Sequence, residues 1–206
     1  WLIMLEVYHF VNPLSGDSLE TEKKLASYVT TATEKIALQV VPVMTMQSVH
    51  ETAVALGHPE QEQVLSQTMY RFILDVKALQ FQGKKVARRF LEAAQTAIFS
   101  GQPYTNEFVM GLVADMAADQ TLFLEDRNSD LTIQAYRADH NMAAEMGVTQ
   151  FPTLVVYNTN GANHASRTTY FSDESLRSLI TPSASHQLNT YDGYLHNGHV
   201  TEIEEG

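Results

Sequence analysis

The stretch His9-Phe10-Val11-Asn12-Pro13-Leu14-Ser15-Gly16-Asp17-Ser18 decides the fold of this chain. It closes an apolar, β-branched and aromatic run, Leu2 to Val11, which is typical of a strand covered on both faces. A helical pattern that runs to about Ala32 begins directly after it. We therefore interpret the stretch as a strand–turn–helix start, with residues 15–18 in the first turn of the helix.

The first turn of a helix is a place where an anion is stabilised. It carries unpaired backbone N–H groups and the positive end of the helix dipole. Two cysteines at positions 15 and 18 would form a redox pair there, because the helix end stabilises a thiolate. Both positions hold serine, and the 206 residues contain no cysteine. Since disulfide exchange requires a thiolate, we expect no oxidase or isomerase chemistry from these residues.

The composition narrows the classes of partner. The chain carries 13 Lys and Arg against 24 Asp and Glu, a formal charge of −11. This balance argues against nucleic acid and against an anionic membrane surface as partners. No apolar run reaches the roughly 18 residues of a membrane span, and the first strand lacks the basic flank of a signal peptide. We therefore predict a cytoplasmic protein that binds neither nucleic acid nor membrane.

Periodicity and turn residues predict the remaining elements. A second strand covers Ile36 to Met44, with Pro42 marking either its end or an edge strand. Four or five helices are expected after His58-Pro59, over about 60–81, 84–99, 105–116, 122–126 and 130–146. The last part contains a strand, a turn, a second strand and a short helix, over about 154–157, 158–161, 167–171 and 173–180.

The order of elements is β-α-β, a block of helices, then β-β-α. Without the block, a four-stranded sheet flanked by helices remains, which makes the fold class α/β with an all-helical insertion. We predict one domain from residues 1–58 and 148–181, an insertion domain over 59–147, and a polar tail over 182–206. We expect the tail to be disordered, or ordered only by a partner.

This order resembles the DsbA branch of the thioredoxin superfamily. A second feature, Gly147-Val148-Thr149-Gln150-Phe151-Pro152-Thr153-Leu154, is similar to the Gly-Val-x-x-x-Pro-Thr segment of that branch. The resemblance implies a DsbA-like thioredoxin fold in which Pro152 is a cis-proline that faces the Ser15–Ser18 turn.

Within that branch the chain resembles the bacterial SpxH/YjbH group. The similarity spans roughly residues 2–158, and its strongest segments are Leu5–Leu14, Gln82–Leu91 and Ala143–Val148. Members of this group are cytoplasmic adaptors that present the regulator Spx to the ClpXP protease. They commonly have Cys-Pro-x-Cys where this chain has Ser15-Gly16-Asp17-Ser18.

The resemblance implies a protein that binds a protein partner, an Spx-like regulator or ClpXP, and the absence of cysteine predicts that it is redox-inactive. We predict a binding groove between the Ser15–Ser18 turn and the Phe151–Thr153 loop, or an adjoining surface of the sheet. The predicted binding residues are Pro13, Ser15, Gly16, Asp17, Ser18, Phe151, Pro152 and Thr153. No catalytic residue and no cofactor are expected.

The alternative is a glutathione-dependent enzyme. The chain is also similar in fold order to kappa-class glutathione transferases and their isomerase relatives, which keep a serine at this turn. In that case Ser15 would stabilise the glutathione thiolate, because hydroxyl and helix-end N–H donors both favour an anion. The simpler interpretation is that Ser15 and Ser18 are helix caps.

Hydrolase and metal chemistry are not expected. Leu14-Ser15-Gly16 does not match a nucleophile elbow, and His9 is interpreted as a core or sheet-end histidine instead of a general base. His186, His196 and His199 lie in an irregular polar segment without a helix to fix their spacing. We therefore predict no metal site.

Overall fold

A computed structural model of the chain describes residues 4–32, 35–158, 165–169, 172, 174 and 201–202. The chain divides into two compact units. Unit 1 comprises Trp1–Val11, Thr21–Val41 and Met142–Gly206, and unit 2 comprises Asn12–Glu20 and Pro42–Asn141. The domain boundaries predicted from the sequence stay a prediction.

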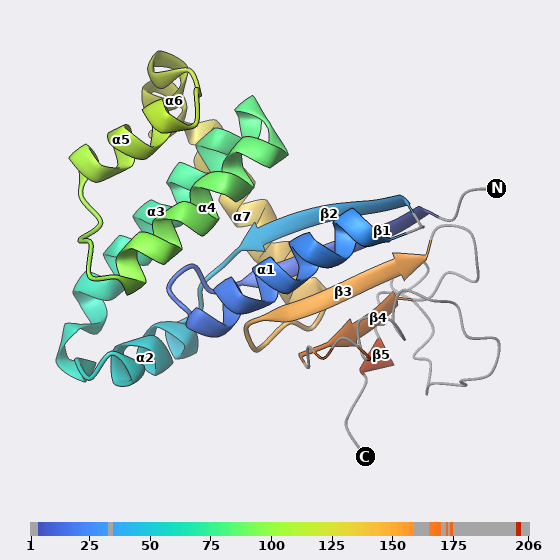
Figure 1. Ribbon diagram of the computed structural model, residues 1–206. Helices are drawn as coiled ribbons and strands as arrows, with labels where there is room; N and C mark the ends of the chain where they lie inside the picture. Colours follow the sequence, from blue (N-terminus) through green and yellow to red (C-terminus); the bar gives the residue numbers. More distant parts are fainter. Residues whose placement is uncertain are drawn as a thin grey trace. The chain divides into compact units, whose positions relative to one another are not determined.

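The described chain begins with the order strand, helix, strand, continues with consecutive helices and ends with three strands (Figure 1). In chain order they are β1 (Met4–Val11), α1 (Gly16–Thr31), β2 (Lys35–Pro42), α2 (Met46–Ala55), the 3-10 helix η1 (Pro59–Gln61), α3 (Glu62–Gln82), α4 (Lys84–Phe99), α5 (Asn106–Asp115), α6 (Gln120–Asp126), α7 (Asp130–Glu145), β3 (Thr153–Asn158), β4 (Ala165–Thr168) and β5 (Thr201–Glu202).

The sheet of unit 1 has the strand order β2-β1-β3-β4-β5. β1 and β3 are antiparallel, as are β3 and β4, whereas β4 and β5 are parallel. The arrows of β2 and β3 point in opposite directions in Figure 1, so β2 runs parallel to β1, as the β-α-β order predicts. β2 lies at one edge of the described sheet and ends at Pro42, a residue that sheets confine to edge strands and strand ends.

Strand alternation builds the core of unit 1. Leu5 and Val7 project to one face of β1 and pack with Leu154 and Val156 of β3 and with Leu25 of α1. All five side chains are buried. The apolar run that suggested a strand covered on both faces thus becomes a central strand.

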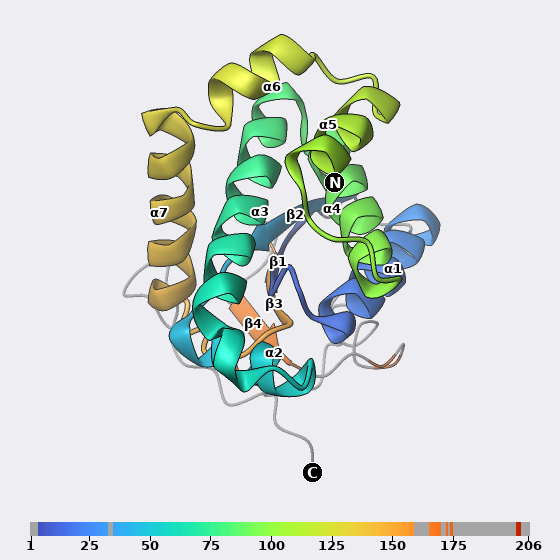
Figure 2. The same cartoon turned by 90° about the vertical axis from the view of Figure 1, so that its left-hand side faces the viewer.

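Unit 2 has its own core between helices. Figure 2 shows α3 and α4 side by side, and the ring of Phe72 on α3 meets that of Phe90 on α4 edge to face, with centroids 6.0 Å apart. Gly83 separates the two helices, as predicted, and adopts a φ of 147° that side chains rarely take.

Two elements differ from the prediction. The sequence analysis missed α2, although Thr45 and Ser48 form a capping box at its start. It predicted four strands and no structure beyond Thr181, which is wrong at Thr201–Glu202, because these residues form β5. The strand consists of two polar residues paired with β4, so the sequence offers no apolar pattern that would predict it.

Several predicted features lie outside the described residues. They are most of the turn over 158–161, most of the helix over 173–180, the rest of the segment 182–206, and the histidines at 186, 196 and 199. Among the described helices, none combines the length and the apolar character needed to cross a membrane.

Gly147 ends α7 in unit 1, as predicted. Its N–H donates to Ala144 O, and the next N–H, that of Val148, donates to Ala143 O, which makes a Schellman-type end. The φ of Gly147 is 65°. The Arg167 guanidinium from β4 donates to the carbonyls of Met146 and Gly147, and a Cβ on Gly147 would lie 2.5 Å from Arg167 Nη1.

We expect Gly147→Ala to lower the free energy of unfolding by about 1–3 kcal/mol, because the positive φ and the displaced Arg167 add their costs. Urea unfolding followed by circular dichroism measures this. Gly111→Ala is the matched control, since nothing lies within 4 Å of a Cβ at that exposed position inside α5. The control should be neutral or stabilising by up to about 1 kcal/mol, and an equal loss in both variants would contradict the assignment.

Lys77 is a buried cation in unit 2. Its Nζ forms an ion pair with the Asp139 carboxylate of α7 and donates to Gln80 Oε1 at 2.8 Å. Burial lowers the pKa of Lys77 to about 7. The folded chain therefore releases this proton at a lower pH than the unfolded chain does.

Between pH 7 and about 10 the unfolded chain binds the Lys77 proton and the folded chain does not, so the free energy of unfolding rises with pH by up to about 1.4 kcal/mol per unit. We expect the Lys77→Met variant to lack this contribution to the pH dependence of the free energy of unfolding. Urea unfolding at pH 6 to 9 measures both proteins. All other titrating groups are shared, so identical slopes would show that Lys77 does not titrate in this range.

Candidate functional site

The Ser15–Ser18 turn is fixed by local hydrogen bonds within unit 2. The N–H of Ser18 donates to Ser15 Oγ at 3.4 Å, which makes Ser15 the side-chain cap of α1. Ser18 Oγ accepts from the N–H of Asn12 at 3.2 Å, and the Ser18 side chain is buried. Ser15 is thus a helix cap, as one interpretation of the sequence predicts, whereas Ser18 binds the chain before the helix.

Asn12 connects this turn to α2. Its Oδ1 accepts from the N–H of Leu14 at 3.0 Å, and its Nδ2 donates to Thr52 Oγ1 at 2.8 Å. Asn12 and Thr52 are buried. The helix α2, which the sequence analysis missed, therefore supports the turn through a hydrogen bond between residues that are 40 positions apart in the sequence.

The predicted binding residues differ in accessibility. In the turn, Gly16 and Asp17 are exposed and Ser15 is half-buried, whereas Pro13 and Ser18 are buried. In the loop of unit 1, Phe151 is half-buried, and Pro152 and Thr153 are buried. The Phe151–Pro152 peptide bond is cis, the geometry that the resemblance implies. The predicted groove stays a prediction.

His9 is part of the core of unit 1. It is completely buried on β1, and its Nδ1 lies 2.9 Å from Oε2 of Glu22, a buried residue of α1. This placement confirms the interpretation of His9 as a core histidine. The pair joins the central strand to the helix that follows it.

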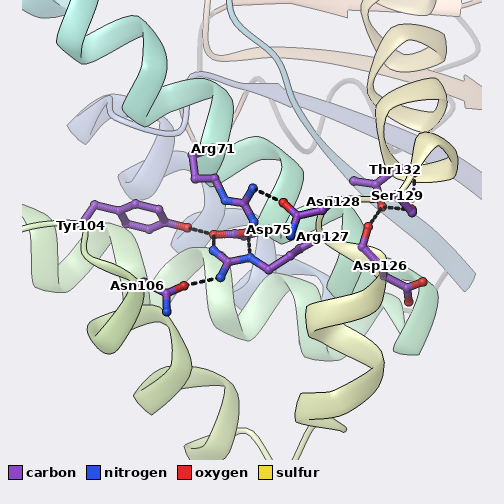
Figure 3. Close-up of polar contacts among 9 residues, drawn as sticks. All are labelled: Arg71, Asp75, Tyr104, Asn106, Asp126, Arg127, Asn128, Ser129 and Thr132. Atoms are coloured by element: carbon purple, nitrogen blue, oxygen red, sulfur yellow. Dashed lines mark hydrogen bonds and ion pairs between the residues drawn. The ribbon is translucent and has the colours of Figure 1, made fainter.

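The sequence analysis missed a network of polar side chains around Asp75 in unit 2 (Figure 3). Asp75 has no exposed surface. Arg127 binds it with two parallel bonds, Nε to Oδ1 at 2.9 Å and Nη2 to Oδ2 at 2.8 Å. The Tyr104 hydroxyl donates to Oδ2 at 2.8 Å, and Arg71 Nη2 lies 3.1 Å from Oδ1.

The network continues to two asparagines. Arg127 Nη1 donates to Asn106 Oδ1, and Arg71 Nη1 donates to Asn128 Oδ1 at 2.8 Å. Burial, together with the nearby Asp75 carboxylate, raises the pKa of the Tyr104 phenol, which therefore remains a donor. The Arg127 guanidinium also lies over the Phe123 ring, 4.9 Å from its centre.

A surface pocket of about 300 Å³ opens beside this network. Its polar lining residues are Arg71, Tyr104, Thr105, Asn106, Arg127 and Asn128. One signal in the sequence points to this place: Asp75 stands inside the apolar run Phe72-Ile73-Leu74-Asp75-Val76, where an unpaired carboxylate would be costly. The partners of Asp75 are too distant in sequence for local pattern to identify.

The described residues offer no cluster of three or more His, Asp or Glu side chains that could hold a metal ion. The histidines of the segment 182–206 are outside this statement. That no metal site exists stays a prediction.

Comparison with curated proteins supports the resemblance to SpxH adapters. The chain is 36% identical over 102 residues to the ClpXP adapter protein SpxH of Bacillus subtilis, which covers 48% of this chain and 34% of that protein. The alignments thus span about a third of the length of the first curated relatives. The recognition stated from the sequence is confirmed at this level.

Solved structures confirm the fold class. A candidate protein disulfide isomerase from Nitrosomonas europaea superposes with a TM-score of 0.66 at 16% identity, over 87% of this chain and 96% of that one. The oxidoreductase DsbA from Xylella fastidiosa superposes with a TM-score of 0.52 at 16% identity, over 74% and 73%. At this identity the likeness shows the fold alone.

A family model described as Thioredoxin matches residues 8–175, a range that starts within β1 and ends after β4. The match includes the capped turn at Ser15 and the loop that contains the cis bond before Pro152. Because it covers far more than half of the sequence, this chain belongs to the thioredoxin family.

Proposed function

We propose that this thioredoxin-fold chain is a protein-binding adaptor that presents an Spx-like regulator to the ClpXP protease. The observation that carries the proposal is the 36% identity to a Bacillus subtilis protein named as a ClpXP adapter. The alignment covers about half of this chain, so the proposal concerns the region that the two proteins share.

The proposed adaptor works without thiol chemistry. Disulfide exchange begins with a thiolate that attacks a disulfide, and the 206 residues supply no cysteine. The two serines of the turn also have structural roles, since Ser15 caps α1 and Ser18 accepts a hydrogen bond from the Asn12 N–H. These bonds assign the two hydroxyls to the stability of the turn, so neither is needed as a reactive group.

We assign contact with the partner to the accessible members of the predicted set. Gly16 and Asp17 are exposed, and Ser15 and Phe151 are half-buried. The other members are buried, and we assign to them the support of the turn and of the loop: Pro13, Ser18, Pro152 and Thr153. Asp17 brings a negative charge, which favours a partner surface with Lys or Arg opposite to it.

The direct test is degradation of purified Spx by purified ClpXP with and without this chain. We expect the chain to raise the initial rate of Spx degradation. The Asp17→Lys variant should need an about tenfold higher concentration for the same acceleration, because it reverses a charge at the proposed contact. Glu125→Lys, at an exposed position of α6, is the matched charge-reversal control and should behave as the unchanged chain.

No acceleration by the unchanged chain would refute the presentation of Spx. Equal weakening by Asp17→Lys and Glu125→Lys would move the contact away from the turn. Binding of Spx without acceleration, measured by calorimetry, would retain a binding module and reject its link to the protease.

The glutathione-dependent alternative is favoured by one observation, the half-buried Ser15 hydroxyl at the start of α1. As a cap alone, Ser15 should contribute stability and no affinity. We expect Ser15→Ala to lower the free energy of unfolding by about 1 kcal/mol and Ser15→Asp, which retains an acceptor, to restore it.

Calorimetric titration with reduced glutathione separates the two roles. The adaptor proposal expects no saturable heat at millimolar glutathione from any of these proteins. Saturable heat from the unchanged chain that disappears in Ser15→Ala would favour a transferase or isomerase.

A further inference from the structure

We propose that the pocket beside Asp75 in unit 2 binds a single oxyanion, a phosphate or a carboxylate group. The inference goes beyond the adaptor function and does not depend on it. It rests on the charge, the hydrogen-bond donors and the helix end that meet at this pocket (Figure 3).

The charge at the pocket is positive. Two guanidinium groups, Arg71 and Arg127, share one carboxylate, Asp75, which leaves one positive charge uncompensated within the network. None of the described residues that line the pocket is acidic. Figure 3 shows the Asp126 side chain pointing away from both guanidinium groups. A singly charged anion would balance the site.

The pocket wall presents donors because its acceptors are already used. Asn106 Oδ1 accepts from Arg127, and Asn128 Oδ1 accepts from Arg71. Each amide oxygen therefore faces an arginine, and each amide NH₂ group is left to donate elsewhere. Both asparagines are exposed, so these groups are accessible to a ligand.

Arg71 adds further donors. Its Nη1 donates to Asn128 and its Nη2 contacts Asp75, so three of its five N–H groups have no acceptor in the described part of the chain. Its side chain is one-third exposed, at 33%. Arg127, at 6%, is held in place beneath by its two bonds to Asp75. One arginine thus anchors the site, and the other reaches its opening.

The N-terminus of α5 lies at the same pocket. Thr105 caps this ten-residue helix by accepting from the N–H of Phe108, and Thr105 and Asn106 both line the pocket. The positive end of the helix dipole therefore adds to the guanidinium charge. With about 300 Å³ of space, the pocket suits a group of the size of phosphate or acetate.

The test is a titration of the whole chain with inorganic phosphate and, separately, with sodium acetate, both at constant ionic strength. Nitrogen–proton NMR follows the arginine Nε–H signals and the backbone N–H signals of residues 105–107. We expect saturable shifts of these signals. Saturation by phosphate alone identifies a phosphate site, and saturation by acetate identifies a carboxylate site.

Asn106→Asp is the decisive variant, because it keeps the oxygen that accepts from Arg127 and replaces the outward NH₂ with a negative oxygen. We expect it to weaken anion binding at least tenfold. Arg71→Gln is a second variant should Asn106→Asp alter the fold, as judged by its spectrum. Arg89→Gln, an exposed arginine on α4, is the matched control and should bind as the unchanged chain.

The proposal would be overturned if the shifts stayed linear with both anions, from 50-fold above the protein concentration up to about 50 mM. A binding site must saturate. An equal loss in Arg89→Gln and Asn106→Asp would also overturn it, because it would show general screening of charge. Unchanged affinity in Asn106→Asp would place the anion elsewhere.

Discussion

The buried Asp75 carboxylate is the constraint on which unit 2 depends. An unpaired charge in that position would cost several kcal/mol, so its partners must be placed with little tolerance. Arg127 comes from the end of α6, Tyr104 from the segment before α5, and Arg71 from one turn earlier on α3. The carboxylate thereby ties two separate segments of the chain to α3, and two arginines meet at one pocket as a consequence.

Unit 1 uses the same physics on a smaller scale. His9 and Glu22 are both buried, and their contact at 2.9 Å joins the central strand to α1. The apolar neighbours Leu5, Val7 and Leu25 supply the area removed from water, which is not directional. The polar pair adds direction, because only one rotation of the helix brings Glu22 to His9. Each unit therefore combines an apolar core with buried polar contacts that tolerate few arrangements.

Whether a feature could be predicted from the sequence depends on how far apart its interacting residues lie along the chain. β1, α3, α4 and the end of α7 at Gly147 were predicted, because apolar periodicity and a glycine at positive φ are local signals. The helix α2 was missed, since it has only ten residues and the segment Met46–Ala55 mixes polar and apolar side chains. The pairing of Asp75 with Arg127 spans 52 positions, and no local pattern encodes a partner at that distance.

The serines of the turn show how a thioredoxin-family fold can persist without its thiols. A serine oxygen accepts a hydrogen bond from a backbone N–H much better than sulfur does. Ser15 and Ser18 each accept one, from Ser18 and from Asn12, and Asn12 in turn binds Thr52 of α2. The first bond satisfies one of the N–H groups that a helix start leaves unpaired, and the second ties the chain before the helix to its first turn. The turn is therefore stabilised by the residues that replace a reactive pair, and its exposed Gly16 and Asp17 remain available for contact with a partner.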